Sequence, residues 1–386
     1  MSKARIGVFT ATRAEYGLLY PILSALRQSE RLEAVLIVSG THLSPDHGMT
    51  VAEIENDGQA IAARIPIQQS DDDALSVGLA MAAALKGCVE AFSTLNLDAV
   101  LLLGDRTELL GAAAAATALQ LPILHIEGGH VTEGAVDDAV RHAITKLAAL
   151  HFTAAEPYRQ RIIQMGEDPE RVFTVGSTGL DNLMAEGVRS IAEIGAEIGL
   201  DLSPAFLLVT FHPETLGAQA PEDQMAALRQ ALDDLPDFKV LYTLPNADEG
   251  NKAIRRAIAD HVSAAPGRVF AVESLGRRRY AWALSAAAAV VGNSSSGVIE
   301  APAHRVATVN IGDRQQGRLR AASVLDVPAE AAAIGQAIRR GVSPEFRCLI
   351  RDQINPMGDG AAGRRIVEIL EGVSFESLRR KRFRDL

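Results

Sequence analysis

Short apolar runs alternate with longer amphipathic segments along almost the whole chain. Two of these runs, Ala99–Leu103 and Leu121–Ile126, end abruptly at glycine or at an acidic residue, and short continuous apolar runs are typical of buried parallel strands. The predicted strands of this half are Ile6–Thr10, Ala34–Val38, Ala99–Leu103, Ile123–Ile126, His151–Ala154 and Val172–Val175. The segments between them have helical spacing and are Leu18–Gln28, Leu75–Leu95, Glu108–Leu119, Asp137–Leu147 and Pro157–Met165.

A second series begins after the amphipathic segment Leu180–Ile198 and the linker-like residues 199–204. Its predicted strands are Phe206–Thr210, Lys239–Thr243, Val269–Val272, Ala289–Val291 and Ala307–Ile311, and Ile366–Glu371 and Ser377–Arg384 complete it as helix. Alternation of this kind predicts an α/β protein with two doubly wound parallel sheets that face a central cleft. We expect domains at residues 1–184 and 185–386, and leave open whether the terminal helix packs back on the first domain.

Composition narrows the class of protein. The chain has 386 residues, of which 48% are hydrophobic, and this is enough for two cores. A net charge of −10 argues against nucleic acid or an anionic membrane as a partner, and the short basic stretch 379–384 is expected to be solvated. Two cysteines without CxxC spacing exclude a disulfide framework or zinc ribbon.

No signal peptide is recognised, and the apolar stretches Gly111–Leu119 and Ala286–Val291 are too short to span a bilayer. A cytoplasmic location is predicted.

Acidic residues gather where two neighbouring strands of the first half end. Asp105 follows one apolar run and Glu127 the next, with Glu133, Asp137 and Asp138 soon after. Because the carboxyl ends of parallel strands share one edge of a sheet, these side chains are expected to lie together and to transfer protons. For Glu133 and Asp138 the favoured interpretation is charge at the start of a helix. Arg141 and His142 are interpreted as contacts within that helix.

Loops of the second half offer groups for an anion. Ser294, Ser295 and Ser296 separate a buried strand from a helix start, where backbone amides favour phosphate. A plain serine N-cap remains an equal alternative. Glu300 is placed to reach a ribose and Arg314 to reach a diphosphate, although an arginine after a strand is commonly just surface.

His212 ends the first strand of the second half, where a histidine could donate to a phosphate or a leaving oxygen, unless it is structural. Ser274 and Gly276 lie where a base-binding loop would be. The chain lacks GxGxxG after its first strand, the phosphate-binding GxxxxGK[ST] pattern and the GxSxG elbow. No metal-ligand spacing is present, so neither metal nor cofactor is expected.

Seven motifs are distributed along nearly the whole chain. They are TATRAEYGLL at Thr10–Leu19, SGTHLSPDHG at Ser39–Gly48, GDRTE at Gly104–Glu108, HIEGGHVTEGAVDDAVRHAITKLA at His125–Ala148, GEDPERVFTVGS at Gly166–Ser177, TFHPET at Thr210–Thr215 and GNSSSGVIEAP at Gly292–Pro302. Together they resemble the UDP-hydrolysing UDP-N-acetylglucosamine 2-epimerases of sialic acid biosynthesis. Bacterial relatives acting on UDP-N,N′-diacetylbacillosamine, on the legionaminic acid route, look similar. The resemblance implies a fold of the GT-B type.

The resemblance also implies residue roles. Asp105, Glu127 and Asp137 match the catalytic carboxylates, and His212 the histidine near the diphosphate. The implied substrate-binding residues are Arg13, Glu15, His42, Ser274, Gly276, Ser294, Ser295, Ser296, Glu300 and Arg314. A UDP sugar is the implied substrate, and a homodimer or homotetramer the expected assembly.

The implied reaction is anti elimination of UDP through a 2-acetamidoglycal, followed by hydration to the free manno-configured sugar. The alternatives are a non-hydrolysing 2-epimerase, a GT-B glycosyltransferase, or a nucleotide-sugar binder without turnover. Loops 41–50 and 177–181 are the candidates for choosing between UDP-N-acetylglucosamine and UDP-N,N′-diacetylbacillosamine, a choice that the sequence leaves open.

Overall fold

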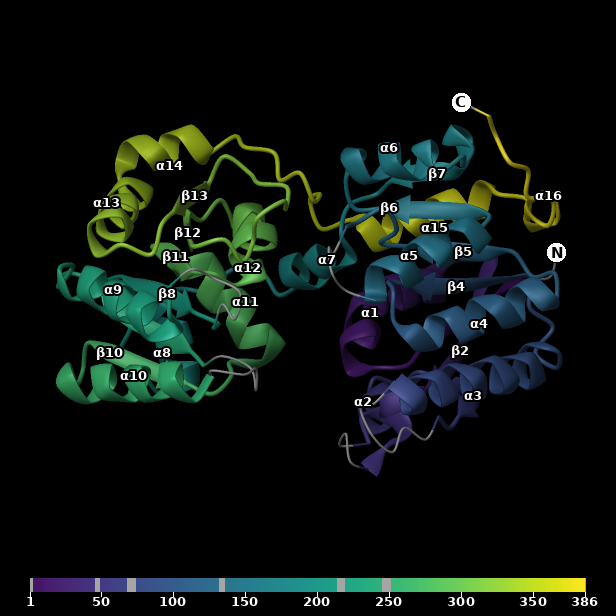
Figure 1. Cartoon of the computed structure of the whole chain (residues 1–386), viewed down its shortest axis with the longest axis horizontal. Coiled ribbons are helices and arrows are strands. Elements are labelled where there is room, and N and C mark those ends of the chain that lie inside the picture. Colours follow the sequence, from purple (N-terminus) through teal and green to yellow (C-terminus); the bar gives the residue numbers. More distant parts are fainter. Residues whose placement is uncertain are drawn as a thin grey trace. The chain divides into compact units, whose positions relative to one another are not determined.

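The computed structural model describes residues 3–45, 49–67, 74–131, 136–213, 219–244 and 251–385. The chain forms two compact units, and each is described by itself. Unit 1 comprises Met1–Asn182 and Ala361–Leu386, and unit 2 comprises Leu183–Gly360. The polypeptide therefore leaves unit 1 once and returns to it for the last 26 residues (Figure 1).

Unit 1 is built on a seven-stranded parallel sheet with strand order β3-β2-β1-β4-β5-β6-β7. Its strands are β1 Ala4–Thr10, β2 Leu32–Ser39, β3 Ile61–Ile65, β4 Ala99–Leu103, β5 Ile123–Ile126, β6 Leu150–Thr153 and β7 Val172–Thr174. Its helices are α1 Arg13–Gln28, α2 Val51–Asn56, α3 Ala74–Phe92, α4 Thr107–Ala118, α5 Val136–Leu147, α6 Glu156–Gln164, α7 Thr178–Ala185 (which runs on into unit 2), α15 Ala362–Gly372 and α16 Phe375–Leu378, with short 3₁₀ turns at Gly40–Leu43 and Pro169–Arg171.

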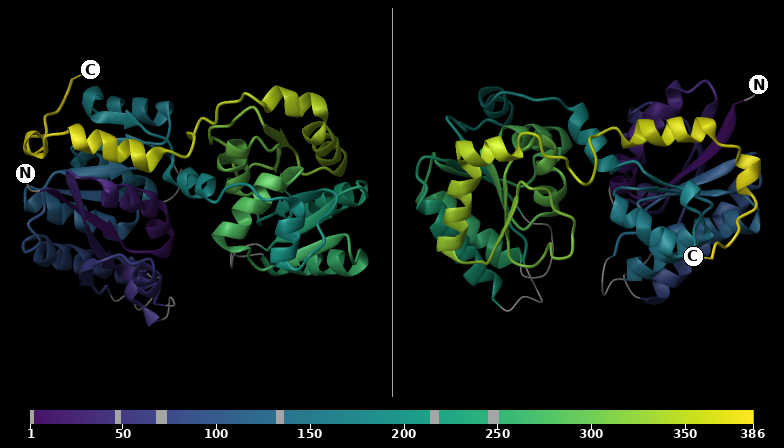
Figure 2. Two further views of the ribbon diagram at one scale, coloured as in Figure 1. Left: turned by 180° about the vertical axis from the view of Figure 1, so that it is seen from behind. Right: turned by 90° about the horizontal axis from the view of Figure 1, so that it is seen from above.

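Two separate hydrophobic clusters lie on the two faces of this sheet. Val8 and Leu101 pack with α1 and α15, whereas their strand neighbours Phe9 and Val100 pack with α3, α4 and α5. Successive side chains of a strand point to opposite faces, so burial of both sets requires helices on both sides. The predicted doubly wound architecture is confirmed (Figure 2).

The carboxyl-terminal segment is tied into unit 1 at the start of α15. The carboxylate of Asp181 accepts hydrogen bonds from the backbone amides of Ala362 (2.9 Å) and Gly363 (2.6 Å), which have no partner inside the helix. Gly363 lies so close to Pro21 that a Cβ there would sit 2.9 Å from its backbone. The glycine therefore lets α15 pack directly on α1.

Unit 2 contains a six-stranded parallel sheet of order β10-β9-β8-β11-β12-β13. The strands are β8 Phe206–Thr210, β9 Lys239–Thr243, β10 Val269–Val272, β11 Ala289–Gly292, β12 Thr308–Ile311 and β13 Val324–Val327. The helices are α8 Ile191–Ile198, α9 Pro221–Asp233, α10 Asn251–Ala264, α11 Gly276–Ala286, α12 Ser295–Ile299, α13 Ala331–Val342 and α14 Pro344–Ile350, with a 3₁₀ turn at Ala301–His304.

The sequence pattern missed the edge strands β3 and β13, whose residues are only partly buried and so lack a continuous apolar run. Two predictions of helix were wrong. Leu180–Ile198 is two helices, α7 and α8, because Gly187 takes a left-handed conformation (φ 69°) and Ser190 caps α8. The predicted helix Ser377–Arg384 ends at Leu378, and the chain beyond is irregular.

The expectation that the apolar stretches of the chain are too short to span a bilayer is wrong for helix α3. Its residues Leu75–Phe92 form one helix long and apolar enough to cross a membrane, with a mean hydropathy of 1.5. In this fold the helix packs along α4, where Gly111 leaves room for the close approach of Ala84. Buried Ser76, Ala80, Ala84, Cys88 and Phe92 recur every four residues, so one side of α3 belongs to the core.

Candidate functional site

Asp105 and Glu127 lie at the same edge of the unit 1 sheet, as the sequence predicted. Strands β4 and β5 are neighbours, with Leu103 level with Ile126, and the two acidic residues follow directly. Asp105 has 28% of its side chain exposed and Glu127 has 16%. Two accessible carboxylates therefore stand at the carboxyl ends of adjacent parallel strands, where α/β proteins bind ligands.

Arg141 of α5 connects Asp105 to this helix. Its guanidinium pairs with Asp105 and with Asp138 (3.1 Å) and donates to the carbonyl of His130 (3.0 Å). Only 6% of the arginine side chain is exposed. A planar guanidinium with several fixed donors is well suited to hold a carboxylate in one orientation.

Glu127 has an uncommon backbone conformation for a residue with a side chain, with φ 62°. Such a conformation costs on the order of 1–2 kcal/mol and is found where the surroundings impose it. The Glu127 carboxylate meets His130 Nε2 at 2.7 Å, and the His130 ring stacks on Tyr158 with centroids 3.9 Å apart. The loop thus presents a carboxylate and an imidazole held within hydrogen-bond distance of each other.

Asp137 is exposed in the first turn of α5, beside the pair formed by Asp138 and Arg141. The structure therefore brings Asp138, rather than Asp137, into contact with Arg141. Glu133 lies outside the described residues.

Arg13 and Glu15 open α1 at the end of β1. Arg13 is 72% exposed and pairs with Glu53 at 3.0 Å. Glu15 is buried, and its Oε2 accepts hydrogen bonds from the amides of Ala11 (2.8 Å) and Thr12 (3.1 Å) in a capping box. Burial raises the pKa of Glu15 to about 7 in spite of these bonds, and its Oε1 has no partner among the described residues.

His42 is fully buried between two threonine hydroxyls. Its Nε2 lies 3.0 Å from Thr10 Oγ1 and its Nδ1 lies 2.8 Å from Thr50 Oγ1. Burial lowers the pKa of His42 to about 4, so the ring is neutral. These contacts hold the 3₁₀ turn Gly40–Leu43 against the end of β1.

In unit 2, Asn293 connects the two predicted anion-binding loops. Its side chain accepts from the amide of His212 (2.7 Å) and donates to the carbonyl of His212 (2.9 Å). Its own carbonyl accepts from Arg314 (3.1 Å) and Gln315 (2.8 Å). Asn293 is fully buried, so this single residue, in the loop after β11, holds the loops after β8 and β12 in place.

The serine loop follows a glycine that no larger residue could replace. Gly292 has φ 134° and lies directly against the backbone of Thr210. Ser294 is the N-cap of α12 and accepts from the amide of Ser296 at 3.4 Å. The three serines are each partly exposed. Both interpretations of this loop, N-cap and anion site, are compatible with the geometry, because one cap occupies one amide only.

Tyr280 of α11 reaches this loop as well, with its hydroxyl 2.5 Å from Ser296 Oγ. Glu300 stands nearby at the end of α12. Its carboxyl group is surrounded by protein although the residue as a whole is only partly buried, and this desolvation raises its pKa to about 7. Burial, with Glu300 as a further cause, raises the pKa of Tyr280.

Ser274 and Gly276 lie on the surface after β10. The Ser274 hydroxyl accepts from the amide of Gly276 at 3.1 Å, and Gly276 begins α11 with φ 64°. The carboxylate of Asp181, in the predicted specificity loop 177–181, is used to cap α15. The other such loop, 41–50, includes residues 46–48, which the structure does not describe.

The structure places at these edges several residues that the sequence pattern did not single out. Arg141 and His130 stood within a recognised motif, but Arg141 meets Asp105 only through a tertiary contact, and His130 meets Glu127 through the conformation of the loop that they share. Asn293 directly precedes the serine loop, and this position between a buried strand and a polar loop was a usable signal. Nothing in the sequence around Tyr280 or Gln315 indicates that these residues lie at the site.

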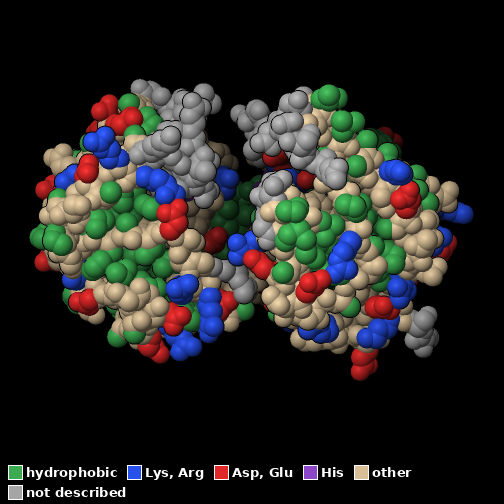
Figure 3. Space-filling model, turned by 90° about the horizontal axis from the view of Figure 1, so that it is seen from below, with side chains coloured by type: hydrophobic (Ala, Val, Ile, Leu, Met, Phe, Trp, Pro, Cys, Tyr) green, Lys and Arg blue, Asp and Glu red, His purple; other side chains and the backbone are tan. Residues whose placement is uncertain are grey.

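Among the described residues, no group of three or more His, Cys, Asp or Glu side chains could hold a metal ion. On the face shown in Figure 3, basic and acidic side chains alternate without a large area of one sign.

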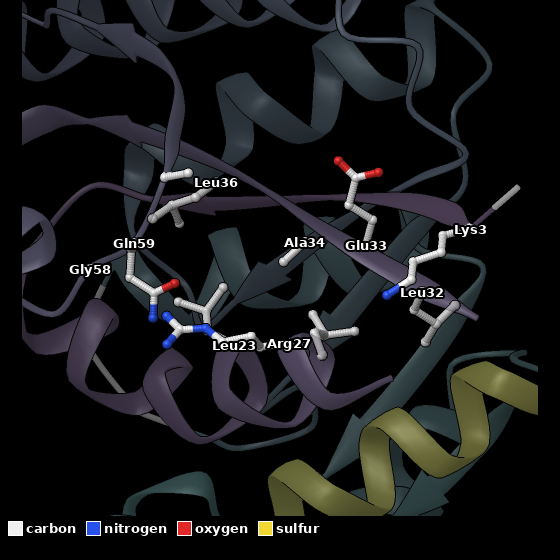
Figure 4. Close-up of a pocket in the computed structure, with 11 residues that line it drawn as sticks. Lys3, Leu23, Arg27, Leu32, Glu33, Ala34, Leu36, Gly58 and Gln59 are labelled. Carbon is white, nitrogen blue, oxygen red and sulfur yellow. The ribbon is translucent and has the colours of Figure 1, made fainter. Parts of the chain in front are cut away.

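A pocket of about 280 Å³ lies beside α1 and β2 (Figure 4). Leu23 and Leu36 line it together with Arg27 and Gln59, and none of the predicted site residues does so.

Comparison with known proteins identifies the family. The family model described as UDP-N-acetylglucosamine 2-epimerase matches residues 24–371. The GDP/UDP-N,N′-diacetylbacillosamine 2-epimerase (hydrolyzing) of Campylobacter jejuni is 33% identical over 100% of both chains. The UDP-N,N′-diacetylbacillosamine 2-epimerase (hydrolyzing) of Legionella pneumophila is 34% identical over 95% of this chain and 96% of its own.

A solved structure shares the fold. The UDP-GlcNAc 2-epimerase from Neisseria meningitidis, crystallised with UDP-GlcNAc, superposes with a TM-score of 0.80 at 19% identity, over 96% of this chain and 100% of that one. The predicted GT-B type of architecture, with two Rossmann-like units, is confirmed by this likeness and by the two parallel sheets. The chain belongs to the UDP-N-acetylglucosamine 2-epimerase family.

Proposed function

We propose that the protein is a hydrolysing 2-epimerase of UDP-2-acetamido sugars, an enzyme of the cytoplasm that serves nonulosonic acid biosynthesis of the sialic or legionaminic type. The observation that carries the proposal is the pairing of Asp105 with Arg141 and of Glu127 with His130 at one sheet edge. Family membership and the names of the two bacterial relatives support the same reaction.

The first step removes UDP. A carboxylate of unit 1 takes the proton from carbon 2 while the bond between carbon 1 and the UDP oxygen breaks, which leaves a 2-acetamidoglycal and free UDP. Because a carbon-2 hydrogen is a weak acid, cleavage at carbon 1 runs ahead and gives the ring oxocarbenium character. The other carboxylates stabilise this positive charge.

The second step adds water to the glycal. Hydroxide is delivered to carbon 1, and carbon 2 receives a proton on the face opposite to the one from which its proton was removed. The configuration at carbon 2 is therefore inverted, and the free sugar has the manno configuration. One group must accept a proton and another donate one, and the Glu127–His130 pair and Asp105 are the candidates for these roles. Asp137 stays in the proposal as a further carboxylate close to this edge.

Unit 2 is proposed to bind the nucleotide. The amides and hydroxyls of Ser294–Ser296 and the guanidinium of Arg314 are suited to the diphosphate, with His212 donating to the leaving oxygen and Glu300 accepting from the ribose. We retain Arg13, Glu15, His42, Ser274 and Gly276 as proposed substrate contacts. For His42 and Glu15, whose polar atoms face the protein, contact with substrate requires rearrangement.

The test is turnover without any acceptor. Purified protein is incubated with UDP-N-acetylglucosamine or with UDP-N,N′-diacetylbacillosamine, and the products are followed by NMR. Free UDP and a free 2-epimerised sugar are expected, faster with the diacetamido sugar because both hydrolysing relatives are named for it. A UDP sugar epimerised without UDP release would identify a non-hydrolysing enzyme. No product would favour a glycosyltransferase or a binder.

We also propose that the protein forms homodimers, alone or as halves of a tetramer, through the exposed side of α3. Leu75, Gly78, Ala82 and Leu85 repeat at spacings of three and four, as in a helix–helix seam. Leu75 is 70% exposed and Leu85 is 38% exposed. In an antiparallel pair with a second copy, Gly78 faces Ala82 and Leu75 faces Leu85, so small residues meet at the centre and leucines at both ends.

Sedimentation velocity tests this assembly. The wild-type protein is expected to be a dimer or tetramer, and Ala82→Glu to dissociate it by placing two carboxylates at the centre of the seam. Leu349→Glu, at a leucine of α14 that is 64% exposed, is the control and should leave the assembly intact. An Ala82→Glu protein that stays associated would remove α3 from the interface.

A further inference from the structure

The chain beyond α16 contacts unit 1 through a few side chains, although residues 382–385 are exposed and Phe383 is 71% exposed. Residues 380–385, called here the C-terminal strap, follow α16 and reach the end of α5. Lys381 Nζ donates to the carbonyl oxygens of Lys146 (2.6 Å) and Ala148 (2.7 Å), with Thr145 at 3.4 Å. The last carbonyl groups of a helix lack intrahelical partners and carry partial negative charge. The ammonium group therefore caps α5.

The same ammonium group belongs to a buried ionic cluster. Glu167 accepts from Lys381 (2.7 Å), Lys146 (2.6 Å) and His151 (3.1 Å), and only 4% of its side chain is exposed. Burial works to raise the pKa of Glu167, but the hydrogen bonds from His151, Lys146 and Lys381 outweigh it and lower this pKa to about 2. The expectation of a solvated basic tail is wrong for Lys381.

Two further contacts hold the strap in place. The Phe383 ring packs on Gly166, which has no side chain to obstruct it, and the Lys146 ammonium lies 5.0 Å from the centre of that ring. Arg384 pairs with Asp168 at 2.8 Å. The strap thus holds the end of α5 and the loop after α6 together.

A chain of buried polar groups runs under α5 from this cluster to the candidate catalytic edge. His151 on β6 is level with His125 on β5. His125 Nε2 donates to the carbonyl of Gly104 (2.8 Å), the residue before Asp105, and its Nδ1 lies 3.2 Å from Thr145 Oγ1 of α5. Both histidines are almost completely buried.

Helix α5 therefore has its C-terminal end held by the strap and carries Arg141 near its middle. Lys146 is five positions after Arg141, about 7.5 Å along a helix. A helix of this length moves as a body, so a shift at its C-terminal end is passed to the Arg141–Asp105 pair. Displacements near 1 Å at reacting groups reduce rates by about 10²-fold.

We infer that the C-terminal strap positions α5 for catalysis, with Lys381 as a positioning residue that sets Arg141 against Asp105. The inference rests on the proposed function, because it assumes that α5 carries groups of the reaction.

The test is Lys381→Met in the full chain. We expect kcat to fall at least 10-fold, with KM for the UDP sugar and affinity for UDP within twofold, and Lys381→Arg to restore most of the rate. The matched control is Arg379→Met, because Arg379 lies just before the strap and pairs with Glu376 of α16 at 3.4 Å. A Lys381→Met enzyme with kcat within twofold of wild type would overturn the inference.

Hydrogen–deuterium exchange of the α5 amides gives a second readout that does not depend on activity. Lys381→Met should raise exchange in α5 while the helices of unit 2 keep their protection. Phe383→Ala is the milder variant should Lys381→Met fail to fold, and it should act in the same direction. Unchanged α5 exchange in the folded variants would overturn the inference. A wild-type protein without epimerase activity would instead refute the proposed function and leave the exchange result to decide whether the strap holds α5.

Discussion

The carboxyl-terminal edges of the two sheets differ in the chemistry that they present. In unit 1 the edge consists of carboxylates held by nitrogen groups, namely Asp105 by Arg141 and Glu127 by His130. In unit 2 it consists mainly of neutral donors, with Asn293 fixing the serine loop, His212 and Arg314 through hydrogen bonds. Two parallel sheets of the same kind thus present different chemical groups at their carboxyl-terminal edges.

This difference indicates a division of the proposed reaction. Paired titratable groups exchange protons, whereas fixed amides and hydroxyls stabilise an anion without changing their own charge. Variants of unit 1 should therefore affect turnover, and variants of unit 2 should affect binding of UDP.

The largest effect is expected for Glu127→Gln. An amide cannot accept the carbon-2 proton, so turnover should fall by about 10²–10⁴-fold. Affinity for UDP, measured by calorimetry, should stay within a few-fold of wild type. Glu170→Gln, at an exposed loop position, is the control. Near-normal turnover in Glu127→Gln would show that Glu127 does not transfer the proton.

Arg141→Met should lower kcat by about 10²-fold with little change in UDP affinity. The substitution leaves Asp105 and Asp138 without the cation that orients them and removes the donor to the His130 carbonyl. Arg159→Met, on α6 of the same unit, provides a control for the loss of an ion pair. If UDP affinity fell as much as kcat, the proposed division of roles, with turnover in unit 1 and UDP binding in unit 2, would be wrong.

Arg314→Gln should weaken UDP binding by about 10-fold, since a charge-assisted hydrogen bond contributes about 1.5–3 kcal/mol. The value of kcat at saturating substrate should change much less. Titration calorimetry with UDP measures the effect, with Arg347→Gln on α14 as the control. Unchanged affinity would leave Arg314 as a surface residue, the alternative reading of its position after a strand.

The last prediction concerns the acid stability of unit 1 and is expected to have the smallest effect on activity and UDP binding. The folded pKa of Glu167 is about 2 against an ordinary value of 4.5, so its contribution to stability is present above pH 4.5 and is lost as the pH falls towards 2. This difference corresponds to about 3 kcal/mol. Glu167→Gln should therefore lower the free energy of unfolding at pH 7 and flatten its decline in acid, as measured by denaturant titrations at several pH values. An unchanged acid profile would contradict the assignment.

The sequence predicted the layered fold well because buried parallel strands are continuous apolar runs. Ala99–Leu103 and Phe206–Thr210 have the same bounds in the structure as in the prediction. Edge strand β3 was missed because it has a neighbouring strand on one side only. Its residues are therefore partly exposed to water, and the sequence lacks a continuous apolar run there. The ends of helices were less predictable: Asp181 caps α15 from a distant part of the chain, and no local pattern reports such a contact.

The candidate site was predictable only in part. The positions of Asp105 and Glu127 at adjacent strand ends followed from strand order alone. Arg141 was interpreted as a contact within its helix, because the pattern does not show that it turns towards Asp105. Glu15 illustrates the opposite case, in which a residue assigned to the substrate uses its carboxylate to cap its own helix.

Turnover of UDP-N,N′-diacetylbacillosamine in D₂O tests the central claim most directly. The account predicts that each UDP released is accompanied by one free sugar of manno configuration that carries deuterium at carbon 2. Release of UDP with a sugar that keeps its gluco configuration and its original hydrogen at carbon 2 would show simple hydrolysis and contradict the account.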